Sequence, residues 1–424
     1  MCREPESQRE CMRILVLGGG VVGVTAAYEL QKDGHEVVLV ERNAQVGTET
    51  SWGNAGMVAP GHSFAWSSPH APMILLKSLF LRDQSLRFKP SIDLDLWTWS
   101  LKFLFQCTKS RSEYNTIRKH RLASYSQQVL HETLRDLDIS YDRVDRGILY
   151  FYRTQARLDA GIAHMQILAR SGQEIEVLDR QRVLALEPSL RHVGDKIVGG
   201  IYCPTDETGD CNKFTAALAA HCVANGAEFR TGESVVGIDA AGDEVVGVRT
   251  NRGTLKADAY VMALGNQSRG LARRLGVSLP IYPVKGYSLT IPVGDAKSPP
   301  TIGSVDEENL VAISPFGDRV RVTATAEISG YSTAHRPSDF DFMARVAREN
   351  YPAGAQHDRA EMWAGLRPMT PTNLPIIGRK RHRNLYYDTG HGHIGWTMSH
   401  GSARILADVV AGRKPSLALE SIVD

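Results

Sequence analysis

The residues best suited to bind a small molecule are an arginine and a tyrosine in the C-terminal half of the chain. Arg367 stands between a glycine and a proline in Gly365-Leu366-Arg367-Pro368. A planar guanidinium can hold a carboxylate at two points and so fix its orientation, which an ammonium cannot do. We therefore expect Arg367 to bind a carboxylate, and the alternative is a structural arginine paired with an acid such as Glu361. Tyr287 could add a hydroxyl to that carboxylate or be an ordinary strand aromatic.

Three histidines complete the set of candidates. His62 follows a Pro-Gly pair and is expected near the mouth of the pocket. His391 and His393 lie in the glycine-rich segment Gly390-His391-Gly392-His393-Ile394-Gly395-Trp396. Histidine titrates near neutral pH and could act as a base. We nevertheless expect His391 and His393 to be mainly structural or to position a cofactor.

A strand followed by a glycine turn predicts a nucleotide site at the start of the chain. The apolar run from Arg13 to Leu17 leads into Gly18-Gly19-Gly20-Val21-Val22-Gly23, which has the pattern Gly-x-Gly-x-x-Gly. The first glycine permits the tight turn, the second lets the backbone approach a pyrophosphate, and the third lets the next helix pack closely. A helix over 21–33 and a strand over 35–41 should follow. Glu41, at the tip of that strand, can accept hydrogen bonds from an adenosine ribose.

A second helix N-terminus is expected to face the same cofactor. A strand from Tyr386 runs into the glycine-rich segment that holds His391 and His393, and a helix follows that ends near Gly412. Backbone N–H groups at the start of such a helix can hold the negative charge that a reduced flavin gathers at its pyrimidine end. An NAD dehydrogenase would normally continue into a separate catalytic domain, so the pattern favours flavin. The alternative is a simple strand-to-helix connection.

Composition and charge indicate an ordinary globular protein. The 424 residues exceed what one core usually holds, so two domains are expected. A net charge of +2 without a long basic tract argues against nucleic acid as the main partner. Six cysteines show no metal-ligand spacing and indicate free thiols in a reducing compartment. Because no signal peptide or apolar run of about 18 residues is present, a cytoplasmic or peripheral protein is expected, with residues 1–11 as a mobile extension.

The remaining elements follow an interrupted order. Helices are expected over 94–105, 118–137 and 213–225, and strands over 147–152, 227–230, 234–238, 257–265, 281–291 and 319–326. The strand over 257–265 ends on Gly265, as a chain does where it passes a cofactor.

Seven motifs in order carry a resemblance to a known family. Beside the two glycine-rich turns, Glu41 and the Arg367 motif, the chain contains Thr50-Ser51-x-x-Asn54-Ala55-Gly56, Asp206-Glu207-Thr208-Gly209-Asp210 and Lys285-Gly286-Tyr287-Ser288. From Met12 onward it resembles the bacterial D-amino acid dehydrogenases, within the group of D-amino acid oxidases and glycine oxidase.

The resemblance implies a fold, a cofactor and its site. The fold is α/β, with a discontinuous Rossmann-like FAD-binding domain (12–92, 175–268 and 358–424) and an α+β substrate domain on an antiparallel sheet (93–174 and 269–357). One FAD is bound without a covalent link, and Arg367 holds the substrate carboxylate. The expected cofactor-binding residues are Gly18, Gly20, Val21, Val22, Gly23, Glu41, Arg42, Ser51, Asn54, Ala55, Gly56, Val235, Gly265, Gly365, Gly392, His393, Ile394, Gly395, Trp396 and Thr397.

The resemblance also implies an activity. D-Amino acids would be oxidised to 2-oxo acids and ammonia, with hydride passing from Cα to flavin N5 and the electrons then passing to a quinone or the respiratory chain. If the amine loses its proton on entering a dry pocket, the reaction does not require a base at Cα. Two alternatives stay open. One is an oxidase that uses dioxygen on D-amino acids, glycine, D-proline or D-hydroxyproline, and the other is a noncatalytic flavin subunit of a larger complex, against which Arg367 argues.

Two stretches set this chain apart. Between Ser51 and Trp66 it departs from the commonest family pattern, because Trp52-Gly53 replaces small alanines and Pro60 to Phe64 replaces a tyrosine-containing loop. Substrate range is therefore the least transferable expectation. Large apolar and basic residues mix over 72–82 and again over 97–105. Such a surface could touch the inner face of the cell membrane or a partner subunit, but core packing is the favoured interpretation.

Overall fold

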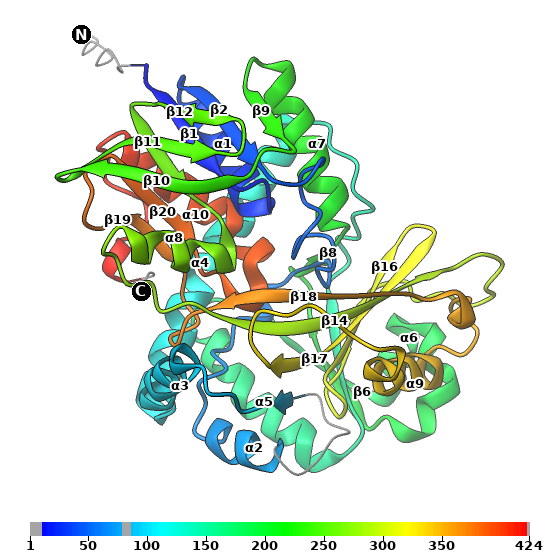
Figure 1. Cartoon of the computed structure of the whole chain (residues 1–424). Helices are drawn as coiled ribbons and strands as arrows, with labels where there is room; N and C mark the ends of the chain where they lie inside the picture. The colour runs from blue at the N-terminus through cyan, green and yellow to red at the C-terminus, as the bar shows by residue number, and fades with distance from the viewer. Residues whose placement is uncertain (1–10, 79–85, 422–424) are drawn as a thin grey trace, which may run out of the picture.

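The computed structural model describes residues 11–78 and 86–421 of the chain. The expected extension over 1–11 therefore lies almost wholly outside the described residues, as does Cys2. The other five cysteines are free thiols, as predicted. The chain forms a mixed α/β fold with two main sheets, one in the upper and one in the lower half of Figure 1.

The first main sheet has six strands in the order β19-β20-β13-β1-β2-β9. Its neighbours pair in parallel except β19 and β20, which are antiparallel. The glycine turn follows the central strand, so it opens at the carboxyl edge of the sheet, where such folds bind nucleotides. The strands are β1 (Arg13–Leu17), β2 (Glu36–Glu41), β9 (Glu228–Thr231), β13 (Ala259–Met262), β19 (Ile376–Arg379) and β20 (Leu385–Thr389).

Alternate residues of β1 pack against different layers, as the two-residue period of a strand requires. Ile14 and Val16 join a core with the helices α1 (Val21–Lys32), α4 (Lys109–Asp136), α7 (Cys211–Ala224) and α10 (Gly395–Val410). Leu15 and Leu17 pack toward α8 (Ser268–Arg274) and a three-stranded antiparallel sheet. That sheet consists of β10 (Val235–Ala241), β11 (Glu244–Thr250) and β12 (Gly253–Leu255).

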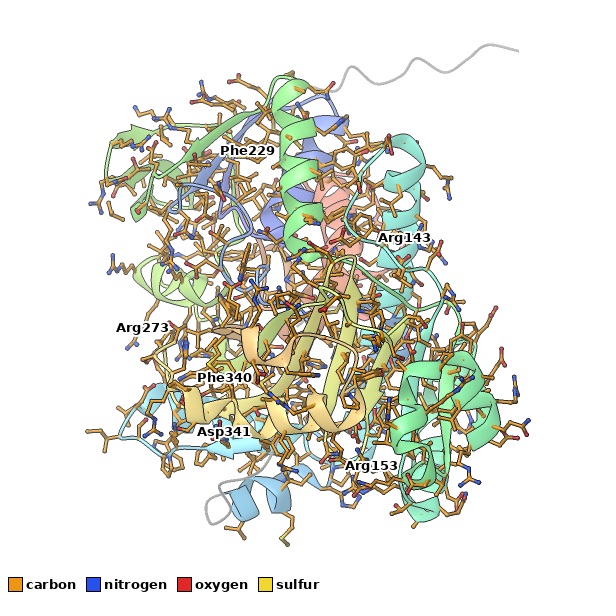
Figure 2. The ribbon with its side chains drawn as sticks, turned by 90° about the vertical axis from the view of Figure 1, so that its right-hand side faces the viewer. Arg143, Arg153, Phe229, Arg273, Phe340 and Asp341 are labelled. Atoms are coloured by element: carbon orange, nitrogen blue, oxygen red, sulfur yellow. The ribbon has the colours of Figure 1, made fainter. Side chains whose placement is uncertain are left out.

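The second main sheet has nine strands and is mostly antiparallel. Its path is β18-β14-β17-β16-β15-β5-β7-β6, with β4 paired to β17. In the side view, Phe340 and Asp341 mark the start of α9 (Asp341–Asn350), which crosses the front of this sheet (Figure 2). The strands are β4 (Leu86–Phe88), β5 (Ile148–Tyr152), β6 (Glu176–Asp179), β7 (Gly199–Cys203), β14 (Tyr282–Pro292), β15 (Gly303–Asp306), β16 (Val311–Phe316), β17 (Arg319–Ile328) and β18 (Glu361–Met369).

Shorter elements complete the fold. A two-stranded ribbon, β3 (Met57–Val58) with β8 (Glu207–Thr208), lies near the start of α10. The remaining helices are α2 (Ala71–Ser78), α3 (Leu94–Gln106), α5 (Gln155–Ala169) and α6 (Arg180–Leu186), and two 3₁₀ turns matter for the site, η1 (Pro60–His62) and η6 (Gly392–Ile394).

Four elements pack with a different sheet from the one that the expected domain segments assign them to. β6 and β7, from the segment 175–268, pair with β5 in the nine-stranded sheet, and β18, from 358–424, pairs with β14 there. Conversely α4, from the segment 93–174, buries Leu122, Ala123 and Leu130 in the core of the six-stranded half. Strand and helix patterns predict an element but not its partner, which is why these assignments differ.

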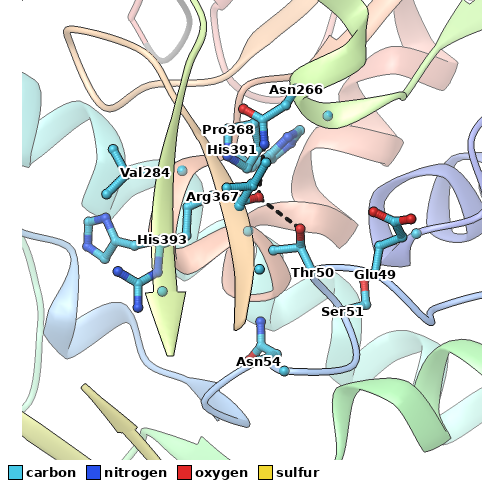
Figure 3. A pocket seen from close by; sticks show the side chains of 18 of the residues that line it. Glu49, Thr50, Ser51, Asn54, Asn266, Val284, Arg367, Pro368, His391 and His393 are labelled. Atoms are coloured by element: carbon cyan, nitrogen blue, oxygen red, sulfur yellow. Dashed lines mark hydrogen bonds between the residues drawn. The ribbon is translucent and has the colours of Figure 1, made fainter. Parts of the chain in front are cut away.

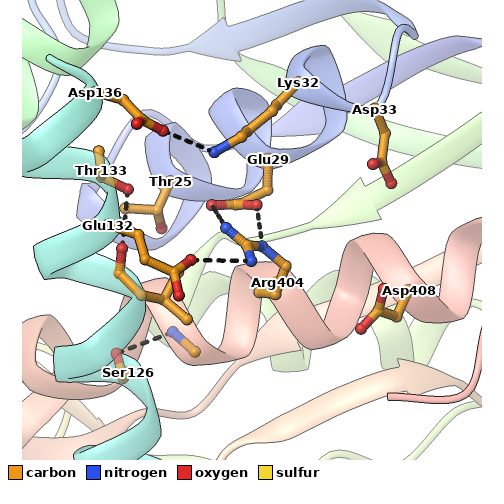
Figure 4. A network of polar contacts seen from close by, with 12 residues as sticks. Thr25, Glu29, Lys32, Asp33, Ser126, Glu132, Thr133, Asp136, Arg404 and Asp408 are labelled. Atoms are coloured by element: carbon orange, nitrogen blue, oxygen red, sulfur yellow. Dashed lines mark hydrogen bonds and ion pairs between the residues drawn. The ribbon is translucent and has the colours of Figure 1, made fainter. Parts of the chain in front are cut away.

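The helix α4 is tied to α1 and α10 by buried polar contacts as well. Arg404 of α10 pairs with Glu29 of α1, whose side chain is almost fully buried, and reaches Glu132 of α4 at 3.4 Å (Figure 4). The Ser126 hydroxyl accepts a hydrogen bond from the Gly401 backbone N–H at 2.9 Å. A Cβ at Gly401 would lie 2.9 Å from the Ser126 Cα. The three helices therefore pack at close range.

Candidate active site

A cavity of about 1140 Å³ runs between the two main sheets. Its walls come from the glycine turn after β1, the loop from Thr48 to Ala59, the start of α10, and the facing strands β14, β17 and β18. Pockets that bind drug-sized ligands measure roughly 300 to 1000 Å³, so this cavity is at the upper end of that range. The cavity therefore has room for a dinucleotide and a small second molecule.

The glycine turn is built as its spacing predicts. Gly18 has a φ of +109°, and a Cβ there would lie 2.6 Å from the Ala263 carbonyl oxygen. A Cβ at Gly23 would lie 1.9 Å from the Gly18 carbonyl oxygen, so only glycine lets α1 start this close to β1. A Cβ at Gly20 would meet only the Ser51 hydroxyl, at 3.6 Å. The backbone of Gly20 thus stays open to the cavity, which it lines.

Glu41 ends β2 at the cavity wall, buried but lining it. Its Oε2 accepts the Gly19 N–H at 2.7 Å, and its Oε1 accepts the Asn43 N–H at 2.8 Å. Each carboxylate oxygen can accept a second hydrogen bond. The two backbone N–H groups therefore fix the carboxylate and leave it able to accept hydrogen bonds from a ligand. This arrangement fits a ribose diol.

Two cavity-lining residues carry buried polar atoms without a hydrogen-bond partner among the described residues. The indole Nε1 of Trp396 and the amide Oδ1 of Asn266 are buried and have no hydrogen-bond partner among the described residues, and both residues line the cavity. The Asn266 amide N–H₂ and the Thr50 hydroxyl both donate to the Leu366 carbonyl oxygen (Figure 3). Buried donors and acceptors without partners are costly unless a ligand satisfies them. The residues present therefore fit a bound flavin nucleotide.

Most of the predicted site residues line this one cavity. Gly23, Gly56 and Thr397 do not. Gly23 acts through helix packing, and the Thr397 hydroxyl donates to the Met57 carbonyl and accepts the Ala59 N–H, both at 3.2 Å. The predicted residues on the cavity wall are Gly18, Gly20, Val21, Val22, Glu41, Arg42, Ser51, Asn54, Ala55, His62, Val235, Gly265, Tyr287, Gly365, Arg367, Gly392, His393, Ile394, Gly395 and Trp396.

Arg367 projects from β18 into the substrate end of the cavity. Its backbone pairs with Val284 of β14, but no hydrogen bond or ion pair joins its guanidinium to any residue that the structure describes, Glu361 included. Its guanidinium lies over the Trp66 ring, 5.7 Å from the ring centroid. Desolvation lowers its pKa to about 10, so it still carries a full charge at neutral pH. Arg367 is half-buried, and a guanidinium in a cavity wall without an acidic partner is suited to bind an anion.

Tyr287 lines the cavity, but its hydroxyl has another partner. The hydroxyl donates to Glu327 Oε2 at 3.1 Å, within a group that includes Lys89 and Lys285. Burial is the main cause that raises the pKa of Tyr287. Of the two interpretations of Tyr287, the strand aromatic fits this geometry better than the carboxylate-binding hydroxyl.

The histidines divide between two surroundings. His391 is buried, with Nε2 lying 2.9 Å from the Ser402 hydroxyl and 3.3 Å from Asp388 Oδ1. His62 and His393 line the cavity with their rings edge to face, 6.3 Å apart between centroids. Burial, aided by Lys119 and His164, lowers the pKa of His62 to about 4. His62 is therefore neutral at physiological pH.

The loop that departs from the family pattern makes room for one indole. A Cβ at Gly53 would lie 1.9 Å from the Trp363 ring, and a Cβ at Gly365 would lie 1.9 Å from the same ring. Trp363 therefore lies between two glycines at the cavity wall. The position of its indole requires that residue 53 has no side chain.

Sequence reasoning missed Trp363, Asn266 and Lys119. Lys119 lies on the buried face of α4, one helical turn from Thr116 and Ala123. The sequence could have indicated Lys119, because this lysine falls among the positions of an amphipathic helix that face the core.

Comparison with known proteins identifies the family of this chain. A model of the DAO family, described as FAD dependent oxidoreductase, matches residues 13–409. The chain belongs to this family. The oxidoreductase is 46% identical over 413 residues to "D-amino acid dehydrogenase 2" of Mesorhizobium japonicum, covering 97% of this chain and 99% of that protein. It is 44% identical to the D-amino acid dehydrogenase of Methylobacterium radiotolerans, covering 97% and 98%. The cofactor of this flavoprotein is FAD.

Solved structures show the same fold. Glycine oxidase from Geobacillus kaustophilus superposes with a TM-score of 0.73 at 23% identity, covering 97% of this chain and 98% of that one. L-proline dehydrogenase from P. horikoshii superposes with a TM-score of 0.71 at 19% identity, covering 96% and 95%. The FAD-binding, Rossmann-like α/β fold expected from the sequence is confirmed.

Proposed function

We propose that this flavoprotein oxidises D-amino acids to 2-oxo acids and ammonia. The observation that carries the proposal is Arg367, a charged guanidinium without a protein partner among the described residues, in the same cavity as the nucleotide-binding turn. A two-point contact with the α-carboxylate would fix Cα relative to the flavin. Bound FAD supplies the acceptor for a hydride. The dehydrogenases that share 46% and 44% identity with the chain support a D-amino acid substrate.

Replacement of Arg367 by lysine tests this role, because it keeps the charge and removes the planar fork. One charge-assisted hydrogen bond contributes roughly 1.5 to 3 kcal/mol, so anaerobic flavin reduction by D-amino acids should slow by about 10- to 100-fold with unchanged FAD content. An amine without a carboxylate should be nearly indifferent to the change. If Arg367→Lys sheds FAD while the remaining holoenzyme reduces normally, Arg367 is structural.

We also propose that the electrons leave for a quinone at a membrane surface. No helix in the described part of the chain combines the length and apolarity needed to span a bilayer. The expectation of core packing holds for Trp99 and Phe103, which are buried, and not for Trp97 and Phe105, which are exposed. Residues 79–82 of the first apolar stretch lie outside the described residues. Several apolar side chains of α2 and α3 are thus exposed. This apolar surface consists of Met73, Ile74, Leu76, Leu94, Trp97, Leu101, Leu104 and Phe105.

Two observations support a lipid surface as the partner of this face. Ile74, which belongs to this surface, also lines the cavity, together with the buried side chains of Trp99 and Phe103, so the surface reaches the site. Exposed Lys102 and Lys109 stand beside it, as on interfacial helices that bind anionic lipid.

Vesicle binding tests the membrane proposal. The double variant Leu101→Ser with Phe105→Ser should bind vesicles of mixed anionic and neutral lipid about 10-fold more weakly in a flotation assay, because two apolar side chains no longer enter the interface. Val223→Ser, on the exposed face of α7, is the matched control and should bind as the wild type does. Equal binding by all three proteins would contradict the proposal, and faster reoxidation by dioxygen than by a quinone analogue would favour the oxidase.

A further inference from the structure

Strand β17 contains one extra residue opposite β14, at the substrate end of the cavity. Gly286 pairs with Ala326 and Tyr287 pairs with Ala324, so Thr325 has no partner in the register between the two strands. A β-bulge of this kind bends the strand and redirects a side chain, and bulges are common beside active sites. Thr325 lines the cavity.

The backbone of Thr325 is strained. Its φ is +56°, a left-handed conformation that glycine adopts freely and that a β-branched residue rarely adopts. Residues held in such a conformation by the surrounding structure cluster at active sites and ligand-binding sites. A glycine would form the bulge without strain, so the course of the backbone alone does not account for a threonine at this position.

The Thr325 hydroxyl has no partner within the described part of the chain. The residue is 5% exposed, and no hydrogen bond joins its hydroxyl to another described residue. Unlike the fully enclosed Trp396 Nε1 and Asn266 Oδ1, the hydroxyl oxygen retains accessible surface. A hydroxyl can donate one hydrogen bond and accept two. A nearly buried hydroxyl without a protein partner is therefore suited to a polar atom of a ligand.

Arg367 brings its charge close to this bulge. Its side chain starts on β18 and crosses β14, where a Cβ at Gly286 would lie 2.7 Å from the guanidinium Cζ (Figure 3). On its other side β14 pairs with β17, and the partner of Gly286 there is Ala326, which follows Thr325. Neighbouring strands are about 4.8 Å apart. An anion on the terminal nitrogens of Arg367 therefore lies next to the bulge of β17.

We propose that the Thr325 hydroxyl donates a hydrogen bond to the substrate carboxylate that Arg367 binds. The proposal rests on the proposed oxidation of amino acids, in which Arg367 holds that carboxylate. Each oxygen of a carboxylate has room for two hydrogen bonds, so the hydroxyl and the guanidinium do not compete for it.

The second donor restricts the orientation of the bound amino acid. A two-point contact with a guanidinium holds the carboxylate in one plane, but the amino acid can still tilt about the line between the two groups. A donor from a different strand removes this freedom. The side chain of threonine has few χ1 rotamers and the bulge fixes its backbone, so the donor is in place before the substrate arrives. Thr325 then helps to keep Cα in line with the flavin.

Three substitutions at Thr325 test the role of the hydroxyl. Thr325→Val removes it and keeps the β-branched shape, Thr325→Gly removes it together with the strain, and Thr325→Ser keeps it. In anaerobic titrations that follow the flavin spectrum, the Kd for benzoate, a carboxylate without an amine, should rise about 10-fold in the valine and glycine variants and stay within about twofold in the serine variant. FAD content should be unchanged in all three.

Thr290→Val is the matched control, because Thr290 is buried on the neighbouring strand β14 and does not line the cavity. Its Kd for benzoate should equal that of the wild type. Unchanged benzoate binding by Thr325→Val would overturn the proposal. Loss of FAD from both Thr325→Val and Thr325→Gly would also overturn it, because the hydroxyl would then serve the cofactor.

A double variant tests the link to Arg367. If both groups bind one carboxylate, Thr325→Val should raise the Kd for benzoate much less in Arg367→Lys than in the wild type, because the two effects are then not additive. Equal increases in both backgrounds, or weaker binding of amines that have no carboxylate, would contradict the proposal. Wild-type flavin that binds benzoate but is reduced by no D-amino acid would instead refute the proposed function.

Discussion

Gly286 shows how one absent side chain shapes the substrate end of the cavity. It pairs with Gly365 across β14 and β18, and a Cβ at Gly286 would lie 2.6 Å from Arg367 Nη2. The guanidinium thus lies across a backbone that has no side chain to exclude it. The position of Arg367 depends on Gly286 as much as on its own strand.

Gly286→Ala should therefore disturb substrate binding without disturbing the cofactor. The added methyl displaces the guanidinium, and we expect the Kd for the amino acid in anaerobic titrations to rise about 10-fold, equivalent to loss of roughly one charge-assisted hydrogen bond. FAD content should stay the same. Gly270→Ala is the matched control, because a Cβ there has nothing within 4 Å. Equal Kd values for the two variants would show that Arg367 is not where the substrate binds.

At the scale of elements, the contact of α1, α4 and α10 holds the nucleotide-binding half together. Glu29 is almost fully buried on α1, and Arg404 of α10 is its ionic partner. A buried carboxylate without its partner is far more costly than an exposed one. The ion pair therefore stabilises the packing of α1 on α10. These two helices follow the two glycine turns, so their packing also positions the turns.

Arg404→Met should lower the free energy of unfolding by about 3 kcal/mol, because Glu29 is left buried and unpaired. Urea denaturation followed by tryptophan fluorescence measures the change. Arg182→Met removes the exposed pair with Glu176 and should change it by less than about 1 kcal/mol. Adding Glu29→Leu to Arg404→Met should restore part of the loss, and a double variant less stable than the single one would contradict this account.

At the scale of the whole molecule, buried neutral histidines link folding to pH. His400 lies in the middle of α10 against Phe214, and burial, aided by Arg404 and His131, lowers its pKa to about 3. In the unfolded chain a histidine titrates near 6.5. Below that pH the unfolded state binds the proton first, so the stability that neutral His400 contributes is present above about pH 6.5 and is lost as pH falls toward 3.

His400→Phe should consequently gain stability relative to the wild type as the medium becomes more acidic. Between pH 6 and 4 the difference in unfolding free energy should move in favour of the variant by about 1.4 kcal/mol per pH unit. Phenylalanine keeps the aromatic packing on Phe214. His192→Gln, at an exposed position, should show no such trend. A pH-independent difference for His400→Phe would mean that His400 takes up its proton at the same pH in the native protein as in the unfolded chain.

Local sequence determined the nucleotide-binding turn, its helix and the two strands around it. Glycine spacing acts within a few residues of the chain, so Gly18, Gly20 and Gly23 carry their conformational requirements with them. The strands over 281–291 and 319–326 and the helix over 213–225 were predicted within a few residues for the same reason, since side-chain period is local. The family and its FAD followed from the order of such motifs, and both are confirmed.

Only the tertiary structure decided which side chains meet. Lys119 and His393 are 274 residues apart, and Gly53 and Trp363 are more than 300 apart, yet each pair is in contact. The partner of the Tyr287 hydroxyl could not be predicted from the sequence, and in the structure the hydroxyl donates to Glu327. The apolar face of α3 has the same pattern whether it is buried or exposed, and what covers it is set by the arrangement of other elements. Burial and pairing are properties of the packed chain, because they depend on neighbours brought together from distant segments.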